Sequence, residues 1–149
     1  MSTVVWLSIC EEVIGLSIDR DYFKDRTEWD GSYPYPPEFK HMEDLSGLEA
    51  APGVLLKPFW GQSLLASYVT FAPNSVAPLH QHEQEQLSLV LQGRLFFTVG
   101  DRSQWMEVGD VVSIPGGVPH AAEAGPEGAV AVDMFSPPRE GFKRDPEAK

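Results

Sequence analysis

Short apolar runs dominate the chain from Gly53 onward, and each run ends at a residue that favours a turn. The runs are Val54–Trp60, Leu64–Phe71, Gln86–Leu91, Leu95–Val99, Trp105–Val108, Val111–Ile114, His120–Ala124 and Ala129–Phe135. The gaps between them hold glycine, proline or asparagine, which supply a positive φ or fix φ. This pattern predicts an all-β sandwich or barrel, and closure into a small barrel or jelly roll would remove exposed sheet edges.

The first fifty residues follow a different pattern. Val4–Ile18 is apolar, and its spacing fits a strand or a short helix equally well. The segment 19–29 is charged and aromatic, and the prolines of the segment 31–37 favour an extended chain. We expect residues 1–50 to form an N-terminal arm that caps the barrel or contacts a second subunit. Residues 51–142 should form the barrel, and residues 143–149 a disordered tail.

Composition narrows the classes of protein to consider. The 149 residues suit one domain with an appendage, and their net charge of -11 argues against binding to nucleic acid. No apolar run approaches the roughly 18 residues of a membrane helix, so no membrane association is expected. A single cysteine, Cys10, and the absence of a signal-peptide pattern predict a cytoplasmic protein.

Three of the four histidines lie in two segments rich in turn residues. His80 and His82 are two positions apart, so an extended strand would aim both rings at one point. Gln86 lies four residues further on, on the same face if the strand stays regular. His120 closes a second segment that reads as strand, turn and strand. These four side chains predict a site for one divalent metal ion, and imidazole and amide ligands suit Zn, Ni, Fe, Mn or Cu.

The spacing of these residues resembles the two sequence motifs of the cupin superfamily. His80, His82 and Gly93 fit the first motif, and Gly109, Pro115, Gly117 and His120 fit the second. The resemblance implies a small cupin β-barrel, a double-stranded β-helix of the jelly-roll type, with the histidines as metal ligands. Asn74 replaces the leading glycine of the first motif, and asparagine also tolerates the left-handed conformation. Ala124 replaces the final asparagine of the second.

Gln86 stands where cupins usually have a ligand glutamate. Glu85 is adjacent but should face the other way, unless a bulge shifts the register and makes it the ligand instead. Three neutral imidazoles and a neutral amide leave the charge of a divalent ion uncompensated. We therefore expect a small anionic substrate that chelates through a carboxylate and a neighbouring oxygen.

The segment 132–141 resembles the last strand of small cupins of the KdgF type, which open unsaturated uronates in pectin and alginate catabolism. This resemblance implies that Asp133, Phe135 and Arg139 line the pocket beside the metal. Strand alternation independently places Asp133 and Phe135 on one face with Ala129 and Ala131. A carboxylate facing a barrel interior can act as a general acid or base, and Arg139 can clamp a substrate carboxylate. Alternatively, Asp133 is a structural partner of Arg94 or Arg139.

The leading hypothesis is a metal-dependent enzyme that isomerises, opens or closes a ring by proton transfer on a carboxylate-bearing unsaturated or keto/enol substrate. Three alternatives remain open: a cyclase of the polyketide type with a larger hydrophobic substrate, an iron-dependent dioxygenase, and a non-catalytic cupin that captures an anionic ligand. The resemblance also implies a homodimer.

Overall fold

The computed structural model describes residues 31–142, and it confirms the predicted all-β fold. Its strands are β1 (Leu48–Ala51), β2 (Val54–Trp60), β3 (Leu65–Phe71), β4 (Val76–His80), β5 (Glu85–Val99), β6 (Arg102–Met106), β7 (Val111–Ile114) and β8 (His120–Ser136). Within the described range, the helical elements are two single-turn 3₁₀ helices, η1 (Met42–Asp44) and η2 (Glu140–Phe142). Residues 31–38 contain no regular secondary structure.

All eight strands belong to one sheet whose pairings are antiparallel. The strand order is β1-β2-β3-β8-β5-β6, with β4 also paired to β8 and β7 also paired to β5. The long strands β5 and β8 pair along almost their whole length, from Glu85 opposite Ser136 to Val99 opposite His120. They form the central ribbon to which the other strands attach.

The central ribbon folds over at its middle, near Gly93. The register between β5 and β8 shifts on either side of this residue, which marks a β-bulge. Gly93 has a φ of 67°, and a Cβ at this position would collide with the backbone oxygen of Gly128. Only glycine satisfies both conditions, so the bend requires it.

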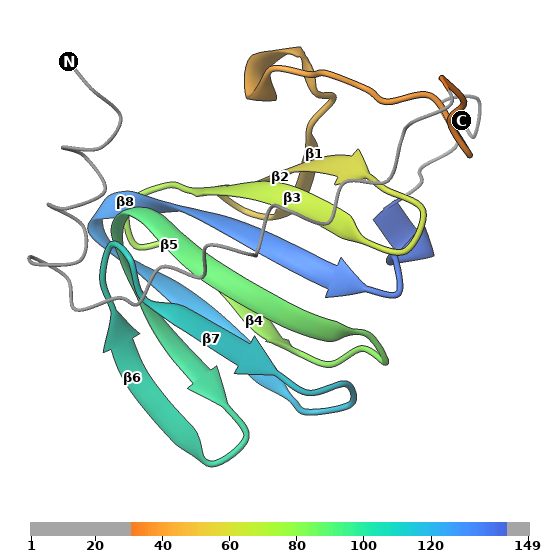
Figure 1. Ribbon diagram of the computed structural model, residues 1–149. Coiled ribbons are helices and arrows are strands. Elements are labelled where there is room, and N and C mark those ends of the chain that lie inside the picture. The colour runs from red at the N-terminus through yellow and green to blue at the C-terminus, as the bar shows by residue number, and fades with distance from the viewer. Residues whose placement is uncertain (1–30, 143–149) are drawn as a thin grey trace, which may run out of the picture. The chain divides into compact units, whose positions relative to one another are not determined.

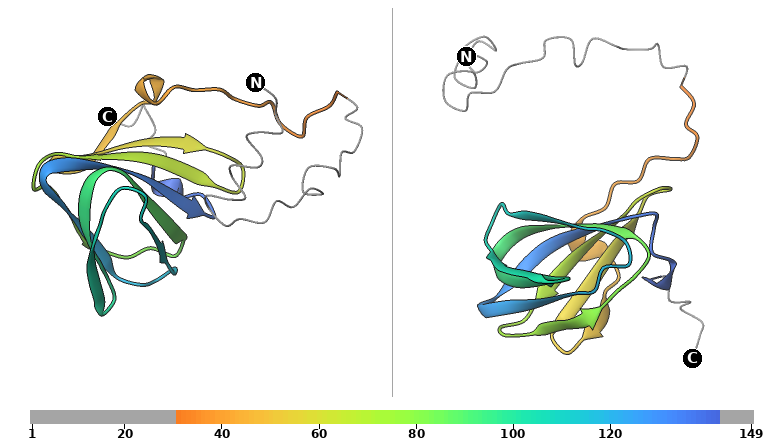
Figure 2. Two further views of the ribbon diagram at one scale, coloured as in Figure 1. Left: turned by 60° about the vertical axis from the view of Figure 1, so that its left-hand side comes forward. Right: turned by 90° about the horizontal axis from the view of Figure 1, so that it is seen from below.

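The bend gives the barrel a closed end and an open end. Gly93 pairs with Ala129 at the closed end, whereas Gln86 pairs with Phe135 near the open end. One half of the ribbon continues into β3, β2 and β1, and the other half into β4 and β6, so the two layers face each other (Figure 1). Figure 2 shows the same two layers from two further directions.

The core fills the space between the layers towards the closed end. In β3 its buried residues alternate with exposed or half-exposed ones over all seven positions. The core cluster comprises Val54, Leu56, Val69, Phe71, Val90, Leu95, Phe97, Met106, Ile114, Ala122, Ala124, Ala129 and Ala131. The outer face of the sheet carries exposed apolar side chains, among them Leu55, Leu87, Leu91 and Val111.

Two details of the predicted strands are wrong. Gln92-Gly93 and the segment 125–128 were expected to be turns, but both lie inside the continuous strands β5 and β8. The glycines at these positions allow a bulge and a bend rather than a reversal of the chain. Only the long-range pairing of the strands distinguishes these two roles. Strands β1 and β4 also lie outside the predicted runs. The predicted left-handed backbone at Asn74 is confirmed, with a φ of 58°.

Several expectations for the N-terminal arm fall on residues 1–30, which lie outside the described residues. These include the apolar segment Val4–Ile18 and the aromatic side chains of Tyr22, Phe23 and Trp29. Within the described range, Tyr33 and Tyr35 are about half exposed. In the part of the chain that the structure describes, no helix is long and apolar enough to span a membrane.

Candidate metal centre

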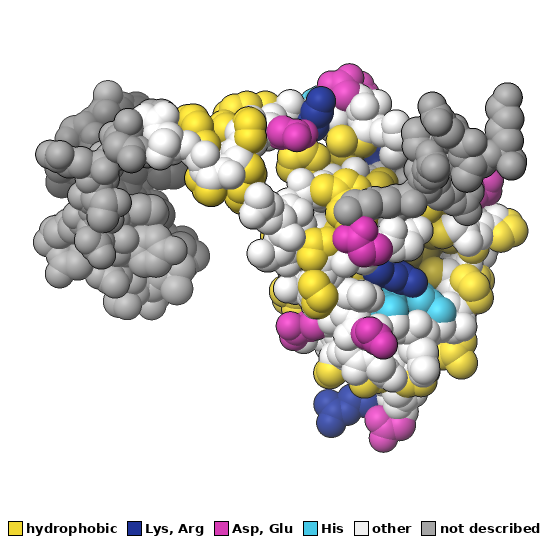
Figure 3. Space-filling view, turned by 90° about the vertical axis from the view of Figure 1, so that its right-hand side faces the viewer, with side chains coloured by type: hydrophobic (Ala, Val, Ile, Leu, Met, Phe, Trp, Pro, Cys, Tyr) yellow, Lys and Arg dark blue, Asp and Glu magenta, His cyan; other side chains and the backbone are white. Residues whose placement is uncertain are grey.

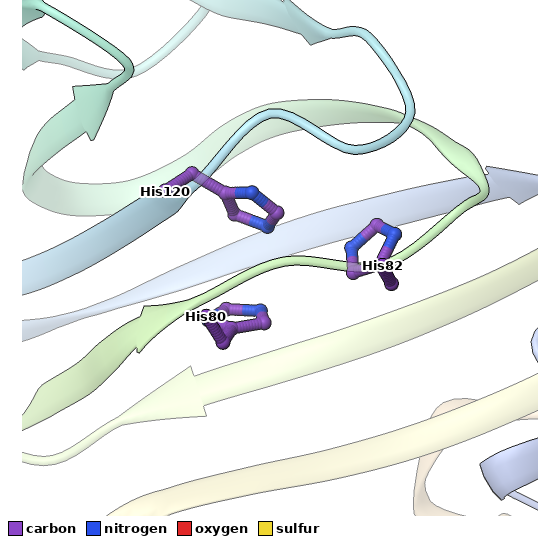
Figure 4. Close-up of side chains that lie close together, drawn as sticks. All are labelled: His80, His82 and His120. Carbon is purple, nitrogen blue, oxygen red and sulfur yellow. The ribbon is translucent and has the colours of Figure 1, made fainter.

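The three predicted histidines come together at the open end of the barrel. Their ligand nitrogens all lie within 4.8 Å of one another. His80 ends β4, His120 begins β8 directly opposite it, and His82 lies in the loop between β4 and β5. Figure 4 shows the three rings around a common space. The site therefore joins a strand pair to a loop.

The predicted route to this arrangement is wrong in one respect. His80 and His82 were expected on one face of a single strand, with Gln86 further along it. Instead, β4 ends at His80, and Gln86 belongs to β5. The chain turns through residues 81–84 between them, and this turn brings Gln86 beside His82.

Each histidine is anchored by the same kind of hydrogen bond. Nδ1 of His80 lies 2.7 Å from the carbonyl oxygen of Pro78, and Nδ1 of His120 lies 2.8 Å from that of Val118. Nδ1 of His82 lies 3.0 Å from the carbonyl oxygen of Gln84. Because a carbonyl only accepts, these contacts favour the proton on Nδ1 and leave the lone pair on Nε2 for a metal ion.

Burial keeps two of the imidazoles neutral. Desolvation lowers the pKa of His120 to about 4, outweighing the hydrogen bond to Val118, and the neighbouring positive charges lower it further. Desolvation also lowers the pKa of His82, and the charge of Arg139 adds to the effect. Neutral imidazole is the form that binds a metal. The buried Nε2 of His120 has no hydrogen-bond partner in the structure.

The loop that carries His82 is held by the second motif. The amide of Gly117 donates a hydrogen bond of 2.7 Å to the carbonyl oxygen of His82. A Cβ at Gly116 would collide with the backbone oxygen of Glu83, so this close approach needs glycine. The glycines between β7 and β8 thus position a metal-binding side chain that lies more than thirty residues earlier in the sequence.

Gln86 connects the histidines to Asp133 through Ser88. Ser88 Oγ donates a 2.6 Å hydrogen bond to Oδ1 of Asp133, so it must accept the 2.9 Å bond from Nε2 of Gln86. This order of donors and acceptors fixes the orientation of the Gln86 amide group, so that its Oε1 faces His82. That oxygen lies 3.0 Å from Nε2 of His82. Gln86 and Ser88 are buried, whereas Glu85 is exposed on the opposite face of β5.

Asp133 and Arg139 lie beside the three histidines. Desolvation raises the pKa of Asp133 to about 6, although hydrogen bonds from Ser88 and Gln86 and the charge of Arg139 oppose the rise. Burial lowers the pKa of Arg139, and the negative charge of Asp133 opposes it. The guanidinium carbon of Arg139 lies 5.8 Å from the ring centre of Phe135, and that ring lies 5.4 Å from His82. Arg94 instead stacks on Trp105, at 4.4 Å.

A cavity of about 260 Å³ opens at this cluster. Five of its lining residues are polar: His80, Gln86, His120, Asp133 and Arg139. The other lining residues are apolar, and they include Phe135 at the mouth and the core residues Val54, Leu56, Val69, Phe71 and Phe97. Figure 3 faces the open end and shows histidine side chains (cyan) reaching the surface beside a basic side chain (dark blue).

The predicted site residues therefore lie in one place. Sequence reasoning overlooked Ser88 and Gly116. Ser88 could have been found from the sequence, because it lies two positions after Gln86 and the two side chains therefore share one face of a strand. Gly116 was not identifiable, because its role depends on the approach of a distant loop. His41, which no motif includes, is exposed and accepts a hydrogen bond from the amide of Glu43.

This donor set fits a divalent metal ion. One nitrogen of each ring lies within 4.8 Å of the other two, and Nε2 of His120 is buried without a hydrogen-bond partner. Two nitrogens bound to one tetrahedral zinc ion lie about 3.4 Å apart, so the three rings would move closer together when they bind the ion. His80, His82 and His120 can therefore hold a metal ion.

Comparison with known families agrees with the fold and the site. A family model described as a cupin domain matches residues 67–135, which run from β3 to β8 and include all three histidines. The chain belongs to the cupin superfamily. Among solved structures it is similar to KdgF, a small cupin. A comparison with curated proteins finds no match.

Solved structures place it among small cupins. KdgF from Halomonas sp. is 26% identical with a TM-score of 0.67, over 72% of this chain and 99% of that one. An RmlC-like cupin from Shewanella frigidimarina is also 26% identical, with a TM-score of 0.66 over 72% of this chain and 96% of that one. Oxalate decarboxylase from Lactobacillus farciminis, 20% identical with a TM-score of 0.60 over 65% of this chain and 32% of that one, shares the fold.

Proposed function

We propose that the protein is a metal-dependent enzyme that isomerises, opens or closes a ring by proton transfer on a carboxylate-bearing substrate. The observation that carries this proposal is the connected row from His82 through Gln86 and Ser88 to Asp133, which joins the metal-binding cluster to a half-buried carboxylate. The cavity meets this row at Gln86 and at Asp133.

His80, His82, Gln86 and His120 would hold one divalent ion. That ion would act as a Lewis acid on a substrate oxygen, which makes an adjacent C–H or O–H more acidic. All four protein ligands are neutral, so an anionic substrate completes the charge balance. The nature of the ion is left open by this set of nitrogen and amide donors.

Asp133 is positioned to carry the proton. Its carboxylate lines the cavity and is oriented by the hydrogen bond from Ser88. In an isomerisation it accepts a proton from one substrate atom and returns it to another, so it is regenerated in each turnover. Arg139 also lines the cavity and can bind the substrate carboxylate through two parallel hydrogen bonds.

The test combines metal loading with two substrates. Metal-free protein is reloaded separately with Zn, Ni, Fe, Mn or Cu and incubated with a 4,5-unsaturated uronate, whose conjugated-alkene absorbance disappears on ring opening. In parallel, deuterium incorporation into a 2-oxo acid in D₂O is followed by NMR. We expect Asp133→Asn to lower either rate at least a hundredfold. The exposed control Asp101→Asn should keep the full rate.

The proposal fails if no metal supports either reaction, or if Asp133→Asn keeps the full rate. Metal-dependent anion binding without turnover would instead favour the non-catalytic cupin. Oxygen consumption that depends on ferrous iron would favour the dioxygenase. The homodimer stays a prediction, to be checked by light scattering.

A further inference from the structure

We infer that the substrate is amphiphilic, with a chelating carboxylate head at the metal-binding cluster and an apolar body in the inner part of the same cavity. This inference rests on the proposed function and adds the chemical class of the molecule. It follows from the way in which polar and apolar side chains are sorted along the cavity.

The strand register divides the cavity into layers. Asp133 pairs with Ser67 on β3 and with Ser88 on β5, so the layer one inward-facing step below Phe135 and Gln86 at the open end is polar. Two residues deeper, Ala131 pairs with Val69, which in turn pairs with Leu56. At the next step, Ala129 pairs with Phe71, which pairs with Val54. The two inner layers therefore lie about 7 Å and about 13 Å below Asp133.

The opposite wall shows the same sorting. His80 pairs with His120 at the open end. One inward-facing step deeper, Ala122 pairs with Ala77 on β4 and with Phe97 on β5. The small side chains Ala77 and Ala122 both line the cavity. A leucine or isoleucine at either position would occupy this space, so the alanines keep the inner part open.

The inner part offers no polar partner to a ligand. The lining residues below the polar layer are apolar, and Val54, Leu56, Val69, Phe71 and Phe97 are each less than a tenth exposed. Their backbone groups belong to paired strands of the sheet. A buried hydroxyl without a partner costs about 1–3 kcal/mol. A polyhydroxylated body would carry several such groups, whereas an alkyl or aryl body would carry none.

The test measures binding to the zinc-loaded full-length protein by isothermal titration calorimetry. The probes are the straight-chain 2-oxo acids from pyruvate to 2-oxooctanoate, which share one chelating head and differ only in the length of the apolar tail. Each added methylene that enters the cavity should lower Kd about fourfold. The gain should stop once the tail exceeds the depth of the inner part.

Two variants locate the tail. Ala122→Leu should abolish the gain with tail length and leave the Kd of pyruvate unchanged, because it fills the inner part without touching the polar layer. Ala66→Leu, on the outer face of β3, should keep the gain. Phe97→Leu enlarges the inner part, and so should extend the gain to longer tails if Ala122→Leu fails to fold.

The outcomes separate the two proposals. A Kd that is the same for pyruvate and for 2-oxooctanoate overturns the amphiphilic substrate and leaves the proposed function standing. A gain with tail length that persists in Ala122→Leu also overturns it, because the tail then lies elsewhere. Failure of the zinc-loaded protein to bind any member overturns both proposals.

Discussion

Oε1 of Gln86 lies 3.0 Å from Nε2 of His82, and the hydrogen bond from Gln86 to Ser88 fixes that oxygen as the atom that faces the ring. When Nδ1 of His82 carries the proton, two lone pairs point into the same space, which is the arrangement that a cation stabilises. A neutral side chain thus occupies the place next to the histidines, and its neutrality has consequences that can be measured.

Gln86→Glu should strengthen metal binding and weaken anion binding. The new carboxylate adds a negative charge within ligand distance of the ion, and one such charge is worth about 1–4 kcal/mol at this range. We expect the metal Kd to fall about tenfold and the Kd of pyruvate for the metal-loaded protein to rise. Competition with a chromophoric chelator measures the first quantity and calorimetry the second. Gln104→Glu, at an exposed position of β6, should change neither. Unchanged metal affinity in Gln86→Glu would contradict a ligand role for this residue.

Gly116→Ala should weaken metal binding without touching any ligand. Its Cβ would push away the backbone of Glu83, next to His82, and so displace one of the three imidazoles. Loss of such a supporting contact typically costs about 10–100-fold in metal affinity. Gly109→Ala is the matched control, because a φ of 93° strains alanine there while open space surrounds the position. Equal metal affinities in the two variants would show that Gly116 serves stability alone.

Ser88→Ala should raise the pKa of Asp133 above about 6. The hydroxyl donates a hydrogen bond that favours the charged carboxylate, and its removal favours the protonated form. Carbon-13 NMR of labelled aspartate in the metal-free protein would follow this titration directly. Ser103→Ala, which removes an exposed hydroxyl paired with Thr98, should leave it unchanged. If the pKa of Asp133 were instead lower in Ser88→Ala, the hydrogen bond from Ser88 would not be what stabilises the charged carboxylate.

The contribution of His120 to the stability of the metal-free protein should be lost as the pH falls from 6.5 towards 4. His120 has a folded-state pKa of about 4 against an unfolded value of 6.5, so the unfolded chain takes up its proton first. The stabilisation is complete above pH 6.5, and the amount lost by pH 4 is on the order of 3 kcal/mol. Urea unfolding with a chelator present should show that wild type loses more stability over this range than His120→Gln. Parallel pH profiles for the two proteins would refute the shifted pKa.

The sequence by itself determined the class of fold and the main members of the site. Apolar runs separated by glycine and proline were sufficient for an all-β fold, because alternation and turn chemistry are local properties. The strands Val54–Trp60 and Val111–Ile114 have the predicted bounds. The spacing of His80, His82 and His120 likewise indicated a metal site, because three unrelated histidines would rarely fall at this spacing among such turn residues.

Tertiary structure alone decided how these parts meet. Gly93 reads locally as a turn, yet it bends a continuous strand, because strand pairing with β8 outweighs the local preference. His82 leaves the strand of His80 and is held by the loop at Gly116 and Gly117, a contact between distant segments that no local pattern encodes. The division of the cavity into a polar mouth and an apolar interior also follows from register between strands. Side-chain alternation gives the inward face of each strand, but only the pairing determines which inward residues share a layer.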